Sequence, residues 1–414
     1  MFRRSGTSAC MGEAIREADW SLIEHQLPTG WRELGAEMGL VKPRPAHIGQ
    51  KIADIGVALR LVLHYVAQRG SQRATIAAAA AAAAGLVTIS QVALHKWMLK
   101  IGDYLEALVA RMVESGQYTS GRWGGYVLVV ADATTVERPG ATGTTARIHY
   151  GLTLADLRPR FIRITDATVG ESMRNFDPEQ GELWIVDRGY ANPPSIEVVV
   201  DRRSDIIVRR NRSSLPVFDV HGQRIDVLDL LGRTTARGHA RERKVYVRTV
   251  AGRMFTVRLC WMRLETVDAA RARAHAQRDG AHDAEELDAA EFIVLITTVP
   301  KERLDVDQVL ALYRARWQVE LDFKRDKSIG QLDTLPSLLP ETIRAWLCAK
   351  VLLGLIARRL ASQQVAVPPS GLGFAILPAT TSEGLRLGSR RRALVRHATC
   401  VDGPPRRPAA DQTA

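Results

Sequence analysis

The chain has 414 residues, of which 46% are hydrophobic, and its 57 Lys and Arg against 45 Asp and Glu give a net charge of +12. This length exceeds what one core usually supports, so we expect a globular protein of two or three domains and exclude a disordered chain. The positive charge favours a polyanionic partner such as nucleic acid, although an Arg-rich composition is equally typical of a GC-rich genome.

The four cysteines form no Cys-x-x-Cys pair or Cys/His cluster, which excludes the common kinds of zinc site and favours a reducing, cytoplasmic setting. The basic N-terminus is not followed by an apolar segment, and the longest apolar run, residues 76–89, is too short to span a bilayer. We therefore expect neither export nor membrane insertion.

The first predicted elements are helices, because apolar residues recur at spacings of three and four over residues 21–117. The alanine-rich residues 74–84 favour one helix, Gly85 ends it, and Ser90 is suited to cap the next. A helix, a short turn and a second helix fit a DNA-reading unit, but such helical hairpins are also common in proteins that do not bind DNA.

The pattern changes at residues 126–131, which are apolar without alternation, as in a strand buried on both faces. Four further strands are expected, at residues 148–154, 161–168, 183–186 and 206–208. One helix, at residues 193–200, is expected between the last two of them. Strands first, then alternation with a helix, predict an α/β fold in which helices cover the faces of a mixed sheet.

The second half of the chain begins with three strand-like segments, at residues 244–250, 254–264 and 292–298. A charged stretch near residues 268–290 lies between the second and the third. They predict a β-rich insertion. Two helices are expected after it, over residues 307–329 and 341–360. The Pro-, Gly- and Arg-rich tail is interpreted either as disordered or as the out-of-frame end of a damaged gene.

Two aspartates follow directly on predicted buried strands, Asp132 after residues 126–131 and Asp187 after residues 183–186. Catalytic groups gather at strand ends in open sheets, and two carboxylates placed together there need a divalent cation, with Mg²⁺ the expected metal. Aspartate is also a common turn residue, which explains either position more simply when it is taken alone.

A third carboxylate lies on the predicted helix over residues 307–329. At about 100° per residue, four residues of this helix share an arc of roughly 80°, namely Tyr313, Arg316, Glu320 and Lys327. Apolar residues separate this face from a second polar face that includes Gln318 and Asp322. Since one polar face can be solvated, we expect the other to point into a site, with Glu320 completing a metal-binding triad and Arg316 and Lys327 holding phosphates.

The spacing Tyr313-x2-Arg316-x3-Glu320-x6-Lys327 resembles the signature of the insertion-sequence-four family of DDE transposases. Asp132-Ala133-Thr134-Thr135 and Asp187-Arg188-Gly189-Tyr190 are similar to the family's two aspartate motifs, in the right order. The resemblance spans about residues 120–363 and implies a ribonuclease-H-like mixed sheet flanked by helices, interrupted by a β-rich insertion and preceded by an all-α N-terminal domain.

This resemblance implies five parts. An N-terminal domain at residues 1–120 binds the element's ends. The catalytic core has two parts, residues 121–211 and 300–363, which flank the insertion at residues 212–299. The tail covers residues 364–414.

By the same resemblance, Asp132, Asp187 and Glu320 hold two Mg²⁺ ions, for which Mn²⁺ can substitute, for in-line attack of water on a phosphodiester. The released 3′ hydroxyl then attacks the opposite strand to form a hairpin, and after reopening it attacks target DNA. The DNA backbone would be bound by Tyr313, Arg316, Lys327 and Arg188.

The resemblance also implies the partners. They are double-stranded DNA at the element's terminal inverted repeats and at the target, bound by a homodimer that is associated with the nucleoid in a bacterial cytoplasm.

Family members stack a flipped base on a tryptophan near the end of the insertion, ahead of a Thr-Thr-x-Pro segment. Here Thr297-Thr298-Val299-Pro300 matches, but Phe292 stands near the place of that tryptophan. Phe292 is therefore the stacking candidate, with a buried strand position as the alternative. Trp317 lies on an apolar edge of its helix and is expected to pack.

Two other functions are compatible with these residues. A metal-dependent DNA nuclease would cut without rejoining, and the triad alone does not distinguish it from a transposase. A non-catalytic DNA-binding remnant of a transposase is the second alternative, but the three carboxylates and the four-residue signature are all present and favour an active enzyme.

Overall fold

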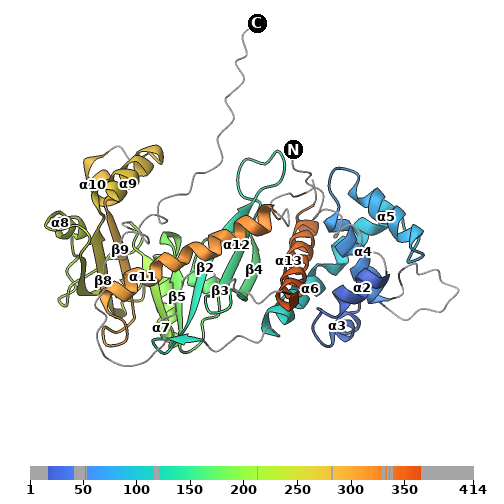
Figure 1. Cartoon of the computed structure of the whole chain (residues 1–414), viewed down its shortest axis with the longest axis horizontal. Coiled ribbons are helices and arrows are strands. Elements are labelled where there is room, and N and C mark those ends of the chain that lie inside the picture. Colours follow the sequence, from blue (N-terminus) through green and yellow to red (C-terminus); the bar gives the residue numbers. More distant parts are fainter. Residues whose placement is uncertain are drawn as a thin grey trace, which may run out of the picture. The chain divides into compact units, whose positions relative to one another are not determined.

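The computed structural model describes residues 17–41, 52, 54–115, 121–211, 213–280, 283–328, 332, 335 and 339–364. Among these residues the chain forms two compact units, the first made of residues up to 206 and from 315 onward and the second of residues 207–314. The predicted tail lies outside the described residues, apart from residue 364. Figure 1 shows the elements of both units.

The first unit contains a mixed sheet in the strand order β4-β3-β2-β5, with β1 paired to β2. Antiparallel pairing joins β1 to β2, β2 to β3 and β3 to β4, whereas β2 and β5 run parallel. The strands are β1 (Arg122–Trp123), β2 (Tyr126–Val136), β3 (Ala146–Thr153), β4 (Pro159–Asp166) and β5 (Glu182–Val186). All five residues of β5 are buried, as its run of apolar residues predicts.

Three helices of the first unit accompany this sheet, α7 (Pro193–Asp201), α12 (Trp317–Ser328) and α13 (Pro340–Gln364). The side chain of Asn192 caps α7 by accepting a hydrogen bond from the backbone N–H of Ser195. Helix α12 packs against β2 and β3. A mixed α/β fold with helices flanking a mixed sheet is therefore confirmed.

The N-terminal part of the first unit is helical, as its periodicity predicts, with α2 (Glu17–Glu24), α3 (Trp31–Glu37), α4 (Ile55–Ala67), α5 (Arg73–Ala83) and α6 (Gln91–Glu114). Gly85, at φ 66°, follows the end of α5, and Ser90 caps α6 by accepting from the backbone N–H of Ala93. Tyr65 of α4 meets Trp346 of α13 edge to face, so these helices share one hydrophobic core with α13. Within the described ranges, no helix is long and apolar enough to cross a membrane.

The second unit is built on antiparallel strands in the order β6-β9-β8-β7, where β6 begins at the division between the units. Its strands are β6 (Asp205–Arg209), β7 (Ala240–Arg248), β8 (Met254–Arg263) and β9 (Phe292–Thr297). Its helices are α8 (Val227–Gly232), α9 (Thr266–Arg278), α10 (Ala284–Ala290) and α11 (Val306–Tyr313). The charged stretch near residues 268–290 thus forms two helices beside the strands.

The long helix expected over residues 307–329 differs from the structure in two ways. A 3-10 turn at Arg314–Arg316 separates α11 from α12. The second polar face is also not solvated, because Gln318 and Asp322 are buried and Asp322 forms an ion pair with Arg358 of α13 at 2.8 Å. The side of the helix that meets solvent includes Trp317, which is 38% exposed rather than packed.

The Asp322–Arg358 pair tethers α12 to α13 and should therefore support the fold. Replacing Asp322 with Asn leaves a partly buried guanidinium without its counter-charge, and we expect a loss of about 2 kcal/mol in the free energy of unfolding. Urea unfolding measures this loss. The matched control is Asp103→Asn, which breaks an exposed pair with Arg344 of the same helix and should cost less than about 1 kcal/mol. Equal losses for both variants would contradict the tethering role.

Candidate active site

The parallel pairing of β2 and β5 brings the two predicted aspartates together. The last pair in register is Ala131 with Val186, so Asp132 and Asp187 are the next residue on each strand. Asp187 follows the end of β5, as predicted, but Asp132 does not end its strand. β2 continues to Val136 because β3 still pairs with it, with Tyr150 opposite Asp132.

A single guanidinium, that of Arg316, contacts the three predicted carboxylates. It donates a hydrogen bond of 2.5 Å to Glu320 Oε1, one turn further along. Its nitrogens lie 3.5 Å from Asp132 Oδ2 and 4.0 Å from Asp187 Oδ1. The Arg316 side chain is only 16% exposed. The structure therefore gathers Asp132, Asp187 and Glu320 around one partly buried positive charge.

The pKa of Asp132 is changed by its position in this cluster. Burial raises the pKa of its carboxyl group to about 7, against the lowering effect of Arg316 and of a backbone hydrogen bond from Ala133. The neighbouring carboxylates of Asp187 and Glu171 push the same pKa upward. A cation with a higher charge than one guanidinium would relieve the repulsion between these carboxylates. Divalent metal ions have this role at such sites.

The donor set suits a hard divalent ion, since all three groups offer carboxylate oxygens. Among the described residues, no three Asp, Glu, His or Cys side chains already stand close enough together to ligate one ion. Arg316 lies between the carboxylates and supplies the compensating charge. Movement of Arg316 away from the carboxylates would leave their oxygens available as ligands. It would also leave their negative charge uncompensated, and a metal ion can compensate for that charge.

A fourth carboxylate, Glu171, lies beside the turn that carries Asp187. A side-chain carbon added to Gly189 would lie 1.6 Å from Glu171 Oε2, and no unusual backbone angle requires glycine there. A side chain at position 189 would therefore require the Glu171 carboxylate to move. Burial raises the pKa of Glu171, Arg147 lowers it, and Asp187 raises it further.

Hydrogen bonds hold the loop that carries Glu171 in place. The Met173 backbone N–H donates to Ser195 Oγ at 3.0 Å, and the Asn175 side chain donates to the Gly170 carbonyl at 2.7 Å. Arg147 of β3 donates to the Val169 carbonyl. The backbone on both sides of Glu171 is thus held by hydrogen bonds. Glu171 was not predicted as a site residue, although the glycine of Asp187-Arg188-Gly189-Tyr190 indicates a close approach by some other group.

Tyr190 places a buried phenol beside the same carboxylates. Its ring is fully buried, and its hydroxyl has no hydrogen-bond partner among the described residues. Burial raises the pKa of this phenol well above 10, and the charge of Asp132 raises it further, so the group stays protonated. The site therefore holds an unused neutral donor next to its acidic groups.

The other predicted site residues lie in different surroundings. Lys327 Nζ lies 3.5 Å from the Thr135 carbonyl at the end of β2, and Arg188 is exposed in a 3-10 turn directly after Asp187. Tyr313 is the last residue of α11 and is half-buried. Phe292 is only 8% exposed and has Arg263 over its ring, so the ring belongs to the core of the second unit and offers little surface for stacking.

Comparison with known proteins agrees with this arrangement. Residues 123–355, more than half of the chain, match the family described as the transposase DDE domain. The chain belongs to the DDE transposase family. The transposase is therefore an enzyme that acts on DNA, and its family uses divalent metal ions.

Two named relatives are similar to this transposase over most of its length. They are the transposase InsL of insertion sequence element IS186A from Escherichia coli strain K12 and the transposase of insertion sequence element IS421 from Escherichia coli. Each is 29% identical to the chain over 376 residues, which cover 86% of this chain and 97% of the relative. The similarity therefore extends beyond the matched domain into the helical N-terminal region.

The raised pKa of Asp132 predicts pH-dependent metal binding by the transposase. A proton competes with metal for this carboxylate below about pH 7, so the affinity for Mn²⁺ should rise about tenfold between pH 6 and pH 8. Titration calorimetry at several pH values measures this rise. Asp132→Asn should remove the pH-dependent part, and an affinity that is flat between pH 6 and pH 8 in the unaltered protein would contradict the account.

The contact between Glu171 and Gly189 predicts a compensating pair of substitutions. Gly189→Ala forces the Glu171 carboxylate to move and displaces the turn before Tyr190, so DNA cleavage should fall about 100-fold. Glu171→Ala in the same chain removes the clashing carboxylate and should restore most of this loss. Cleavage by Gly189→Ala at the unaltered rate would show that the contact does not position the site.

Proposed function

We propose that the chain is the transposase of an insertion sequence, which cuts DNA at the element's terminal inverted repeats and joins the released ends to target DNA. The observation that carries the proposal is the convergence of Asp132, Asp187 and Glu320 on the guanidinium of Arg316. The names of the IS186A and IS421 relatives support the assignment to an insertion sequence. The signature spacing supports placement in the insertion-sequence-four family, with a ribonuclease-H-like core.

Asp132, Asp187 and Glu320 would hold two Mg²⁺ ions, with Mn²⁺ as a substitute. When bound, these ions supply Lewis-acid stabilisation of the phosphate oxygens and lower the pKa of bound water. Glu171 packs against Gly189, two residues after Asp187, and would support the turn that begins there. The Asp322–Arg358 pair fixes α12, and therefore Glu320, by joining it to α13.

Arg316 changes partner when DNA binds. A phosphate accepts two parallel hydrogen bonds from a guanidinium as well as a carboxylate does, so the DNA backbone competes for Arg316. Its departure frees the carboxylates at the moment when substrate arrives. Lys327 and the exposed Arg188 add positive charge on either side, and the family signature adds Tyr313 as a further backbone contact.

The reaction consists of successive displacements at phosphorus and needs no covalent enzyme intermediate. In the first, the oxygen of water forms a bond to phosphorus while the bond to the 3′ oxygen breaks, and that oxygen leaves as a hydroxyl. The released 3′ hydroxyl would then form a P–O bond to the opposite strand and displace a second 3′ oxygen, which closes the hairpin. A second water would attack the same phosphorus and release the element's 3′ hydroxyl again, and this hydroxyl would attack a target phosphodiester and displace a target 3′ oxygen. The buried phenol of Tyr190 is an available hydrogen-bond donor for an oxygen on which charge develops.

The hairpin step needs an aromatic side chain to stack on an unpaired base. Phe292 is buried, whereas Trp317 is 38% exposed and is the first residue of α12, directly after Arg316. Trp317 therefore takes the stacking role in this proposal, since stacking on an aromatic side chain does not depend on base identity. Cutting both ends of an element calls for a homodimer on DNA.

The helical N-terminal region, with exposed His95, Lys96 and Lys100 near the start of α6, is proposed to read the element's ends. The nuclease and the non-catalytic remnant differ from the transposase in what they do to DNA rather than in these residues. The direct test therefore measures what happens to a labelled DNA substrate.

The test incubates the protein with Mg²⁺, a labelled fragment that carries the terminal repeats flanking the gene, and a target plasmid. A transposase integrates the label into the plasmid, a nuclease cuts the fragment only, and a remnant retards it without cutting. Glu320→Gln should lower cleavage at least about 100-fold while retaining DNA binding. Trp317→Ala should impair hairpin formation more than the first nick.

The matched control is Glu341→Gln, which makes the same chemical change at an exposed position in the first turn of α13. Thermal unfolding of each variant separates loss of chemistry from loss of fold. Full cleavage by Glu320→Gln would overturn the site assignment, whatever the outcome for integration.

A further inference from the structure

The β7–β8 hairpin of the second unit ends in a tip with unusual surface chemistry. The tip is a four-residue turn closed by a hydrogen bond of 3.0 Å from the Gly252 N–H to the Thr249 carbonyl, with Gly252 at φ 83°. A second hydrogen bond, from the Arg253 N–H to Thr249 Oγ1, fixes the turn. These hydrogen bonds define the backbone of the tip, and the side chain of Val250 at its apex is 97% exposed.

Two arginines flank this apex, and each lies over an aromatic ring. The Arg248 guanidinium lies 4.5 Å from the centre of the Phe218 ring, and that of Arg253 lies 4.7 Å from the centre of the Phe255 ring. Such stacking orients a guanidinium without removing its hydrogen-bond donors. Both arginines remain exposed.

The register places the two arginines on opposite faces of the hairpin. Val247 pairs with Phe255, so these two residues share one face, and Arg253 joins them through its contact with Phe255. Arg248 follows Val247 and lies on the other face, where it meets Phe218, which pairs with Tyr246. The tip is thus a ribbon with one cation on each side and an apolar residue at its end.

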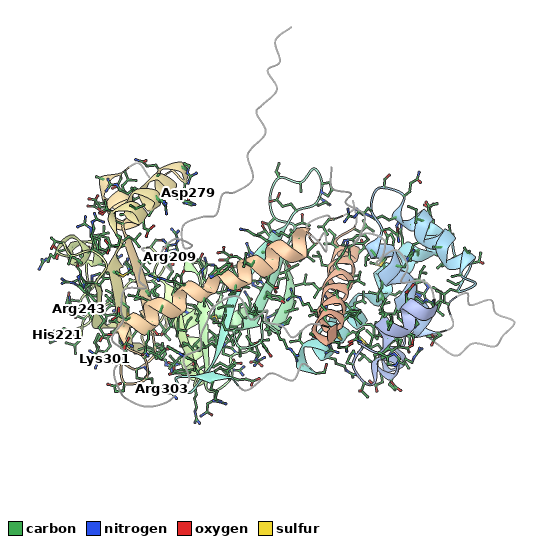
Figure 2. All side chains as sticks on the ribbon, viewed as in Figure 1. Arg209, His221, Arg243, Asp279, Lys301 and Arg303 are labelled. Carbon is green, nitrogen blue, oxygen red and sulfur yellow. The ribbon has the colours of Figure 1, made fainter. Side chains whose placement is uncertain are left out.

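The rest of β7 extends the positive surface. Arg241, Arg243 and Lys244 are exposed, whereas Glu242, the one acidic residue of the strand, is paired with Arg258 and Lys301. Figure 2 shows Arg243 at the surface of the second unit. β7 is the last strand of the sheet order, and Phe218 pairs with its outer edge at Tyr246.

We infer that the β7–β8 hairpin inserts its tip into a groove of duplex DNA. A groove has a phosphate strand on each side, which matches one arginine on each face of the ribbon, and a two-stranded ribbon fits a DNA groove. Val250 at the apex then meets the base edges, where proteins that deform DNA place apolar side chains. This inference rests on the proposed function only in that DNA is the substrate.

Salt dependence of binding tests the phosphate contacts. Each phosphate contact contributes about 0.9 to the slope of log affinity against log salt, so Arg248→Ala with Arg253→Ala should lower the slope by about 2. The probe is a 40-base-pair duplex of mixed sequence, without divalent metal, so that no cleavage occurs. The matched control, Arg271→Ala with Arg278→Ala on α9, removes the same charge from exposed positions and should change the slope by less than half as much.

A tethered cleavage reagent tests the position of the tip. An iron chelate on Val250→Cys, in a chain with Cys10 and Cys400 replaced by serine, leaves the buried Cys260 and Cys348 unlabelled. Cleavage confined to one groove on both strands is expected, and the offset between strands identifies the groove. Uniform or absent cleavage, or equal slopes for the two double variants, would overturn the inference. The slope is measured without catalysis, so failure here is separate from failure of Glu320→Gln to abolish cutting.

Discussion

The ion-pair cluster around Arg316 is the interaction on which the rest of the site depends. Three carboxylates in a partly buried space repel one another, and one guanidinium compensates for them. The surrounding structure serves to hold the partners of this cluster. The parallel register of β2 and β5 sets the two aspartates. A buried ion pair between α12 and α13 fixes α12, which carries Glu320 and begins directly after Arg316.

The ion pairs of Arg316 can couple the binding of DNA to the binding of metal. Arg316 is one cation with two competing sets of anions, the carboxylates within the protein and the phosphates of DNA. In the account proposed here, binding of the DNA backbone releases the carboxylates, and metal then replaces the lost positive charge. DNA binding and metal binding would therefore favour each other, which limits cleavage to sites where DNA is already held.

The elements with strong local signals could be predicted from the sequence. The buried runs before Asp132 and Asp187 formed strands, and the shared face of Arg316 and Glu320 holds in the structure despite the 3-10 turn at Arg314–Arg316. The spacing fixed which residues face one another on the helix because that geometry depends only on residues within two turns. The domain division and the catalytic assignments stay predictions.

Features that depend on distant partners could not be predicted. The second polar face was expected to be solvated, but Arg358, 36 positions after Asp322, supplies a buried counter-charge. Asp132 lies within a strand because β3 pairs beyond the point where β5 ends. Glu171 stands in a loop without any motif, and only the packing against Gly189 shows its place beside Asp187.

The central claim is that Asp132, Asp187 and Glu320 together hold the metal ions once DNA has drawn Arg316 away. Anomalous scattering from crystals of the protein with its element-end DNA and Mn²⁺ tests this claim most directly. We expect anomalous peaks ligated by oxygens of all three carboxylates, with the Arg316 guanidinium on a DNA phosphate. Peaks bound elsewhere, or an Arg316 that remains on the carboxylates in the DNA complex, would contradict it.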